Sequence, residues 1–222
     1  MTRHPRLRLT APTTAAAAAL LLAGCGGGDE GTGGSGKDDR IAGAETGVSA
    51  SASASPSPDR DSGRPEITFP SDAKNVFEDA KTGDPVKDAV LADNARSVNA
   101  IDEAVFAGNT DTEALGFYNT GKALSASITF ARGYIDDNVT WVGVTRYFDR
   151  KVTLSGDDGA YVRYCSDEAK SYIKDRKTGK VDRSPGTDSA YVLYSAKLVK
   201  NAQGVWQTTD IVSNRGDKEC EQ

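Results

Sequence analysis

The chain of 222 residues carries 27 Lys and Arg against 32 Asp and Glu, a net charge of −5, with three cysteines and a single histidine. This acidic balance argues against nucleic-acid binding and against electrostatic attachment to an anionic membrane surface. The histidine is His4, so a chain that loses its N-terminus has no imidazole. Such a chain cannot form a Ser-His-Asp or Cys-His nucleophile system or a His-ligated zinc site. We expect no cofactor and no metal.

The first 24 residues have the pattern of an export signal. Three arginines and no acidic residue precede an apolar run at 15–23, which is far shorter than the roughly 20 residues of a membrane span. The run ends in Leu22-Ala23-Gly24-Cys25, which resembles the bacterial lipobox, where the cysteine is acylated and the chain is cut before it. We expect residues 1–24 to be removed, which lowers the net charge to −8, and Cys25 to be the lipid attachment point. A plain signal peptide with an incidental cysteine is the alternative.

A lipid on Cys25 would place the protein on the outer face of the cytoplasmic membrane, where two or more acyl chains give a stable anchor. Residues 25–66 are then a tether, composed mainly of Gly, Ser, Ala, Asp, Thr and Pro. Such a segment cannot bury enough apolar surface to offset its ordering entropy, so we expect a disordered spacer of roughly 35 Å root-mean-square length. A wall-binding or O-glycosylated segment is the alternative.

Two further cysteines, Cys165 and Cys220, form an even pair in a chain expected to be exported. We predict a disulfide between them. It would close a loop of about 55 residues and stabilise the fold by up to roughly 4 kcal/mol through loop-closure entropy. Two free buried thiols are the alternative. No Cys-x-x-Cys motif indicates a redox role.

Residues 67–222 are long enough for one domain, and its first half is predicted to be helical. We predict a short helix from Ser71 to Lys81, and a second from Asp84-Pro85, an N-cap followed by a first-turn proline, to Gly108. Thr110 and Glu113 have the spacing of a capping box. A stripe at steps of three and four follows, and it predicts either one long helix or, because of its glycines, two shorter ones: Phe117, Gly121, Leu124, Ile128, Ala131 and Ile135.

The second half is predicted to be β structure, with four runs rich in β-branched and aromatic residues separated by Gly-containing or charged turns. Four strands joined by short turns form an antiparallel meander. Helices first and strands afterwards indicate an α+β domain with the helices on one face of the sheet. The predicted strands are Thr140–Leu154, Ala160–Cys165 with an extension towards Tyr172, Ser189–Lys200 and Val205–Ser213.

This order of elements, with a closing strand that begins Gly204-Val205-Trp206, resembles the nuclear-transport-factor-two-like fold, also called SnoaL-like. The lipobox, the tether and the segments 165–168 and 175–180 further resemble uncharacterised actinomycete lipoproteins. The resemblance implies a cone in which N-terminal helices pack on a curved four-stranded antiparallel meander around a pocket. It also implies that two copies could pair through the sheet as a homodimer. It implies no particular chemistry, because the same scaffold holds isomerases, cyclases, dehydratases and binding modules.

Four large amphipathic residues on the predicted strands are candidates for lining that pocket: Tyr147, Tyr164, Tyr194 and Trp206. Packing in the core is the alternative for each. Resemblance to enzymes of the steroid-isomerase type, which use an Asp base beside a Tyr, makes Asp167 and Asp210 weak catalytic candidates. An exposed edge position is the alternative for Asp210.

Two charged segments are weaker candidates for a functional site. Asp167 and Glu168 are adjacent on a strand, so they point to opposite faces and do not chelate one cation. A basic run is predicted to be a solvated surface that discourages edge pairing, with an anion or wall-polymer site as the alternative: Lys170, Lys174, Arg176, Lys177, Lys180 and Arg183.

Our leading hypothesis from the sequence is a non-enzymatic lipoprotein, a binding or interaction module whose partner is an unknown small ligand or an envelope protein. The alternative is a lyase or isomerase with an Asp/Tyr pair in the pocket. A carboxylate deep in an apolar cavity, with a raised pKa, would favour the enzyme. A filled cavity with a flat apolar patch outside would favour protein–protein interaction.

Overall fold

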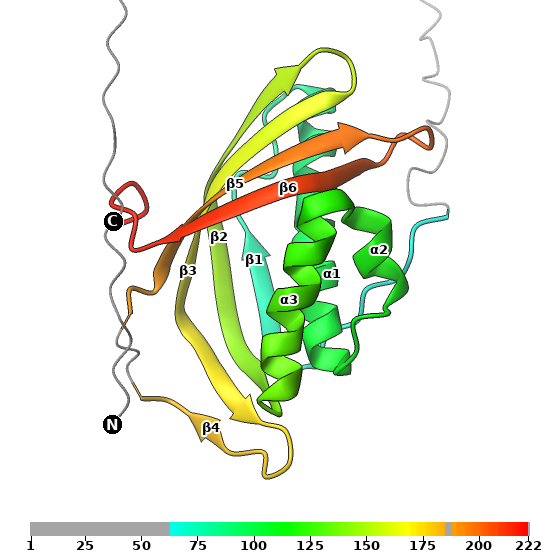
Figure 1. Ribbon diagram of the computed structural model, residues 1–222. Coiled ribbons are helices and arrows are strands. Elements are labelled where there is room, and N and C mark those ends of the chain that lie inside the picture. The colour runs from blue at the N-terminus through cyan, green and yellow to red at the C-terminus, as the bar shows by residue number, and fades with distance from the viewer. Residues whose placement is uncertain (1–62, 185–187, 222) are drawn as a thin grey trace, which may run out of the picture. The chain divides into compact units, whose positions relative to one another are not determined.

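The structure is a computed structural model that describes residues 63–184 and 188–221. The predicted signal peptide, Cys25 and nearly all of the predicted tether lie outside these residues. The described part contains three helices and six strands, packed as a helical layer on one face of a curved sheet (Figure 1). Their bounds are β1 Ala73–Phe77, α1 Pro85–Ala107, α2 Glu113–Tyr118, α3 Gly121–Asp136, β2 Val139–Ser155, β3 Gly159–Asp175, β4 Val181–Asp182, β5 Tyr191–Lys200 and β6 Trp206–Arg215.

The long helix α1 forms as its local sequence predicts. The Asp84 side chain caps the first turn by accepting hydrogen bonds from the backbone N–H groups of Val86 and Lys87, at 2.8 and 3.3 Å. Pro85 occupies the first turn, and Gly108 ends the helix in the left-handed conformation, with φ of 66°. The helix is buried along the face that packs on the sheet, where Val90, Leu91 and Val98 enter the main core.

The predicted helix from Ser71 to Lys81 is wrong. Its centre is the strand β1, which pairs in parallel with β2 from Ala73↔Gly143 to Phe77↔Tyr147. The Phe77 ring stacks on Tyr147 with centroids 4.8 Å apart. A short apolar segment is compatible with either period, and here pairing with a distant strand decides the outcome.

The apolar stripe after α1 forms two helices, the second of the two predicted arrangements. The chain is extended at Asn119 and Thr120, where Asn119 bridges to Thr208 and the Thr120 N–H donates to the Thr208 carbonyl at 2.9 Å. This contact with β6 separates α2 from α3. The predicted capping box is also wrong, since the N-cap of α2 is Thr112 and makes no side-chain cap bond.

The sheet contains the predicted antiparallel meander, β2-β3-β5-β6, but it is larger than predicted. β1 adds a parallel strand beside β2, and the short β4 pairs with β3. β2 and β3 form a long hairpin whose register shifts between Val144 and Arg146 and again between Phe148 and Lys151. Gly143 has φ of 104°, and a Cβ there would lie 2.1 Å from the Lys170 carbonyl oxygen, so the hairpin needs glycine at this position. Such irregularities curve a sheet, and the curvature makes room for a cavity under the helices.

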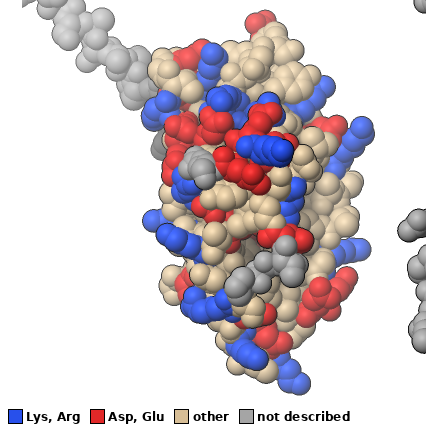
Figure 2. Space-filling view, turned by 90° about the vertical axis from the view of Figure 1, so that its left-hand side faces the viewer, with Lys and Arg blue, Asp and Glu red and all other residues tan. Residues whose placement is uncertain are grey.

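The outer face of the sheet is closed by the C-terminal segment. The predicted disulfide between Cys165 and Cys220 is present, with Cα atoms 5.6 Å apart. It lies in a small apolar cluster with Phe148 and Leu193, away from the main core. Acidic and basic side chains alternate over this side of the molecule, without a large area of one sign (Figure 2). Within residues 63–184 and 188–221, no helix has both the length and the apolar character needed to cross a membrane.

Candidate functional site

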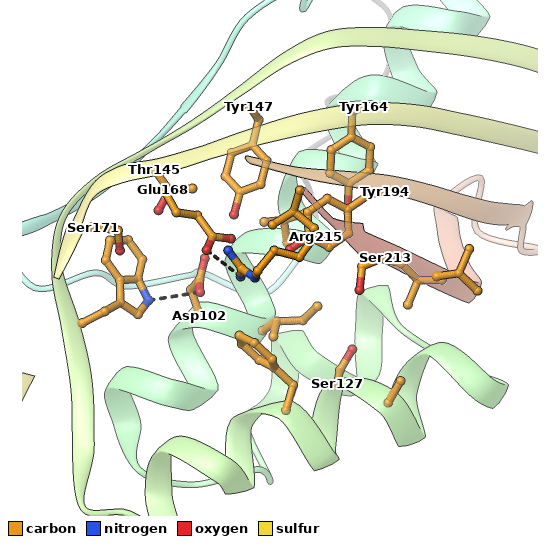
Figure 3. Close-up of a pocket in the computed structure, with 18 of the residues that line it drawn as sticks. Asp102, Ser127, Thr145, Tyr147, Tyr164, Glu168, Ser171, Tyr194, Ser213 and Arg215 are labelled. Atoms are coloured by element: carbon orange, nitrogen blue, oxygen red, sulfur yellow. Dashed lines mark hydrogen bonds and ion pairs between the residues drawn. The ribbon is translucent and has the colours of Figure 1, made fainter. Parts of the chain in front are cut away.

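A cavity of about 320 Å³ lies between the helices and the concave face of the sheet. Its walls come from α1, α3, β2, β3, β5 and β6 (Figure 3). Six aromatic side chains line it: Phe130, Tyr134, Trp141, Tyr147, Tyr164 and Tyr194. Phe130 and Val212, 50% and 65% exposed, are lining residues that also reach solvent. The cavity has the mixed apolar and polar lining typical of small-molecule sites.

Asp102 is the buried carboxylate of this cavity, and it is 8% exposed. It projects from α1, four residues after Val98, on the side of the helix that faces the sheet. Trp141 Nε1 donates a hydrogen bond to Asp102 Oδ1 at 3.2 Å, and Asn75 Nδ2 donates to Oδ2 at 2.6 Å. These two donors come from β2 and β1, so each carboxylate oxygen is fixed by a different strand.

The environment of Asp102 disfavours its charged form. Burial raises the pKa of its carboxyl to about 7, against the lowering effect of the Asn75 and Trp141 hydrogen bonds. The negative charge of Glu168 adds a smaller rise in the same direction. A carboxyl with a pKa near neutrality can both accept and return a proton at physiological pH. This is the property that a general acid–base group needs.

Four tyrosine hydroxyls lie in the same cavity, and burial raises the pKa of each above its ordinary value of 10, that of Tyr134 to about 12. They are therefore neutral hydrogen-bond donors. Asn94 hydrogen-bonds the Tyr164 hydroxyl and Ser166 that of Tyr194. The described residues form no hydrogen bond with the Tyr147 hydroxyl, which points into the cavity in Figure 3. Among the three tyrosines that the sheet contributes, Tyr147 is thus the one whose hydroxyl is available to a bound molecule.

An ion pair forms another part of the wall. Arg215 Nη2 donates to Glu168 Oε2 at 2.8 Å, and Arg215 Nη1 donates to the Ser189 carbonyl at 2.9 Å. The Arg215 and Glu168 side chains are 44% and 29% exposed. Because Arg215 offsets the charge of Glu168, Asp102 is the carboxylate of the cavity without a paired cation.

The structure places the four predicted pocket residues in two groups. Tyr147, Tyr164 and Tyr194 line the cavity. Trp206 does not: it is 1% exposed and belongs to the main core, and its backbone N–H donates to Asp93 Oδ2 at 2.9 Å. For Trp206 the structure therefore supports core packing.

The two aspartates considered as catalytic candidates, Asp167 and Asp210, do not line the cavity. Asp167 follows the opposite alternation of β3 from Tyr164, and its carboxylate pairs with Arg146 at 3.6 Å beside a separate hollow of about 120 Å³. Asp210 is half-exposed and lies 3.8 Å from Lys122 Nζ.

Sequence reasoning missed Asp102, although a signal was present. The residue interrupts the apolar face of a well-predicted helix, directly after Ile101. Its donor Asn75 was hidden by the incorrect helix prediction around β1. Among the described residues, no group of three or more His, Cys, Asp or Glu side chains could hold a metal ion.

Comparison with protein-family models finds no match, and neither does comparison with curated protein sequences. Solved structures with a similar arrangement include a ketosteroid isomerase-like protein from Erwinia carotovora atroseptica, with 17% identity, a TM-score of 0.39 and coverage of 61% of this chain and 99% of that chain. Aln2 from a Streptomyces species has 16% identity, a TM-score of 0.38 and coverage of 61% and 94%. The intermembrane space region of chloroplast protein ARC6 has 11% identity, a TM-score of 0.37 and coverage of 61% and 99%. At these values the likeness assigns neither a family nor an activity to this chain.

Proposed function

We propose that this domain is an acid–base enzyme of the isomerase or lyase class, which takes a proton from a small, largely apolar substrate. The observation that carries the proposal is Asp102, a carboxyl with a pKa of about 7 inside a 320 Å³ aromatic-lined cavity. Asp102 would act as the general base, held in orientation by Trp141 and Asn75. The enzyme, given as the alternative from sequence, thus becomes the first candidate.

The Tyr147 hydroxyl would stabilise the charge that forms on the substrate. Removal of a proton next to a carbonyl group moves negative charge onto the carbonyl oxygen. A buried phenol without a partner can donate a hydrogen bond to that oxygen, and it does so more strongly as the charge grows. Tyr147 and Asp102 would then form the Asp/Tyr pair, with Asp102 in place of Asp167 or Asp210.

Proton exchange of a simple ketone tests this proposal without knowledge of the natural substrate. 2-Tetralone, a bicyclic ketone with acidic α-hydrogens, is incubated with the protein in D₂O, and deuterium incorporation is followed by NMR. We expect exchange above the buffer rate, and a loss of about 10²- to 10⁴-fold in Asp102→Asn. Asp210→Asn, the same change outside the cavity, should exchange as the wild type does. Exchange at the buffer rate in all three proteins would refute the enzyme.

A non-enzymatic binding module, the leading hypothesis from sequence, remains the second candidate. One observation favours it: both oxygens of Asp102 already accept a hydrogen bond from a neutral side chain. A carboxyl held in this way can orient a ligand without reacting with it. This candidate predicts that 2-tetralone binds in the cavity but exchanges no faster than in buffer.

We propose further that the domain is tethered to the outer face of the cytoplasmic membrane by a lipid on Cys25. The residues Leu22-Ala23-Gly24-Cys25 support this, and the Cys165–Cys220 disulfide is in keeping with an oxidising compartment. Growth with an alkyne-labelled fatty acid should label the wild-type protein and leave Cys25→Ser unlabelled. Equal labelling of both proteins would refute acylation at this cysteine.

We also propose that the fold is a member of the SnoaL-like group and that two copies pair through the sheet. Helices that cover one face of a curved, open sheet around a cavity support the first part. The second part rests on the resemblance alone. Sedimentation of residues 63–222 tests it, since a monomer at all concentrations would exclude the homodimer.

A further inference from the structure

Ser127 on α3 is buried in an unusual way. It is 3% exposed and lines the cavity, yet its hydroxyl has no hydrogen-bond partner. Serine and threonine within a helix commonly donate to the carbonyl one turn earlier. The neighbouring Ser125 and Thr129 do so, to Gly121 and Ser125 at 3.3 and 2.9 Å. The Ser127 hydroxyl makes no such bond, so it is left free to interact with something in the cavity.

Ser127 and Asp102 lie on different sides of the cavity. In Figure 3 Asp102, Ser171 and Thr145 appear on the left side of the cavity, whereas Ser127 appears to the right, below Ser213. Apolar groups also line the cavity, among them Val98, Ile211 and Phe130. The cavity therefore offers polar groups on two sides and an apolar lining around them.

We propose that Ser127 determines substrate specificity by hydrogen-bonding a second polar group of the substrate, far from the group that meets Asp102. The inference rests on the proposed function, because it names the class of molecule that the same cavity takes. That class is a small, largely apolar molecule with two separate oxygen functions, one for each polar side of the cavity. A molecule with a single oxygen would leave the buried Ser127 hydroxyl unpaired, and binding would be weaker for it.

Two probes of similar shape test this: 2,6-dihydroxynaphthalene, with a hydroxyl at each end, and 6-methyl-2-naphthol, with a methyl group at the second end. Binding is measured by calorimetry at pH 8, where Asp102 is ionised and can accept a hydrogen bond from the first hydroxyl. The proteins are the wild type, Ser127→Ala and the matched control Ser125→Ala, which changes an exposed serine of the same helix. The ratio of the dissociation constants of the two probes is compared between proteins. The dihydroxy probe can bind in two equivalent orientations, and this statistical factor is the same for every protein, so it cancels in the comparison.

We expect the wild type and Ser125→Ala to prefer the dihydroxy probe by about five- to tenfold more than Ser127→Ala does, the effect of one hydrogen bond. Ser127→Cys, which keeps the side-chain volume, should also lose most of the preference. An unchanged preference in Ser127→Ala, with both probes bound, would overturn the inference and leave the proposed function standing. Loss of binding of both probes in Ser127→Ala alone would assign Ser127 a structural role and overturn it too. If neither probe binds the folded wild type, the proposed function falls and the inference with it.

Discussion

Asp93 and Asp102 are buried on the same helix, at 1% and 8% exposed, but their partners differ in kind. Asp93 is paired with two arginines, since Arg64 Nη1 and Arg96 Nη1 lie 2.5 and 3.2 Å from its Oδ1. Asp102 is bonded to the neutral N–H groups of Trp141 and Asn75. One carboxylate thus has cations beside it and the other does not.

The difference separates a structural aspartate from a reactive one. Asp93 joins the segment before β1, α1 and the start of β6, because it also accepts the Trp206 backbone N–H. Asp102 opens on the cavity, and burial raises its pKa to about 7. A buried carboxylate that is paired with cations, as Asp93 is, holds the fold together through those ion pairs. One without a cation is available for proton transfer.

The largest expected effect is the loss of stability caused by replacing Asp93. Asp93→Asn removes the negative charge that faces the Arg64 guanidinium, on a side chain that is only 13% exposed. We expect a loss of about 3–5 kcal/mol in the free energy of unfolding, measured by urea denaturation at pH 8. Asp102→Asn should lose far less under the same conditions, because it removes a buried charge that has no cation. Equal losses in the two variants would contradict the difference in role between Asp93 and Asp102.

The second effect is on the pH dependence of stability. Because the pKa of Asp102 is raised in the folded state, that state holds the proton more tightly than the unfolded chain, so stability falls as pH rises from about 4 to about 7. The difference from the ordinary value of 3.8 corresponds to at most about 4 kcal/mol. Asp102→Asn should lack this fall, so the wild type and the variant should diverge between pH 4 and 7. Parallel stability curves would show that Asp102 does not titrate near neutrality.

The two aspartates also show which part of the molecule could be predicted from sequence. The helix that carries both was predicted because its signals are local: Asp84 and Pro85 at one end and Gly108 at the other. The meander strands were predicted for the same reason, from turns and alternation. β1 was not, because five residues became a strand only by pairing with β2, far along the chain.

The site was less predictable than the fold because it depends on contacts between distant segments. Tyr147, Tyr164 and Tyr194 were selected by residue type and strand position, and they line the cavity. Trp206 also has a large amphipathic side chain on a predicted strand, but it lies in the core. Residue type does not determine which part of the concave face is filled by packing. The position of Asp102 on the apolar face of its helix indicates burial, but its raised pKa also depends on strands that are distant in the sequence, and no local pattern encodes those contacts.

A third test changes the donors of Asp102 and leaves the carboxyl in place. Trp141→Phe removes the Nε1–H group that bonds Oδ1, and this bond favours the charged form. The pKa of Asp102 should therefore rise further, and the pH midpoint of 2-tetralone exchange should move up by roughly 0.5–1 pH unit, equivalent to one hydrogen bond. Phe106→Leu, a change beside Trp141 that spares the hydrogen bond, is the control for packing. An unmoved midpoint in Trp141→Phe would exclude Asp102 as the base.

The smallest effect is expected at Asp210, an aspartate that is neither buried nor in the cavity. Its carboxylate lies 3.8 Å from Lys122 Nζ, and the two side chains are 46% and 84% exposed. Solvent screens such a pair, so Asp210→Asn should change the free energy of unfolding by less than about 0.5 kcal/mol and leave exchange unchanged. Urea denaturation of Asp210→Asn, measured together with Asp93→Asn and Asp102→Asn, gives the loss of stability expected for an aspartate that is neither buried nor tightly paired. A loss at Asp210 as large as that at Asp93 would mean that aspartate-to-asparagine changes act here through a property other than burial and pairing, and the contrast between the two α1 aspartates would lose its physical basis.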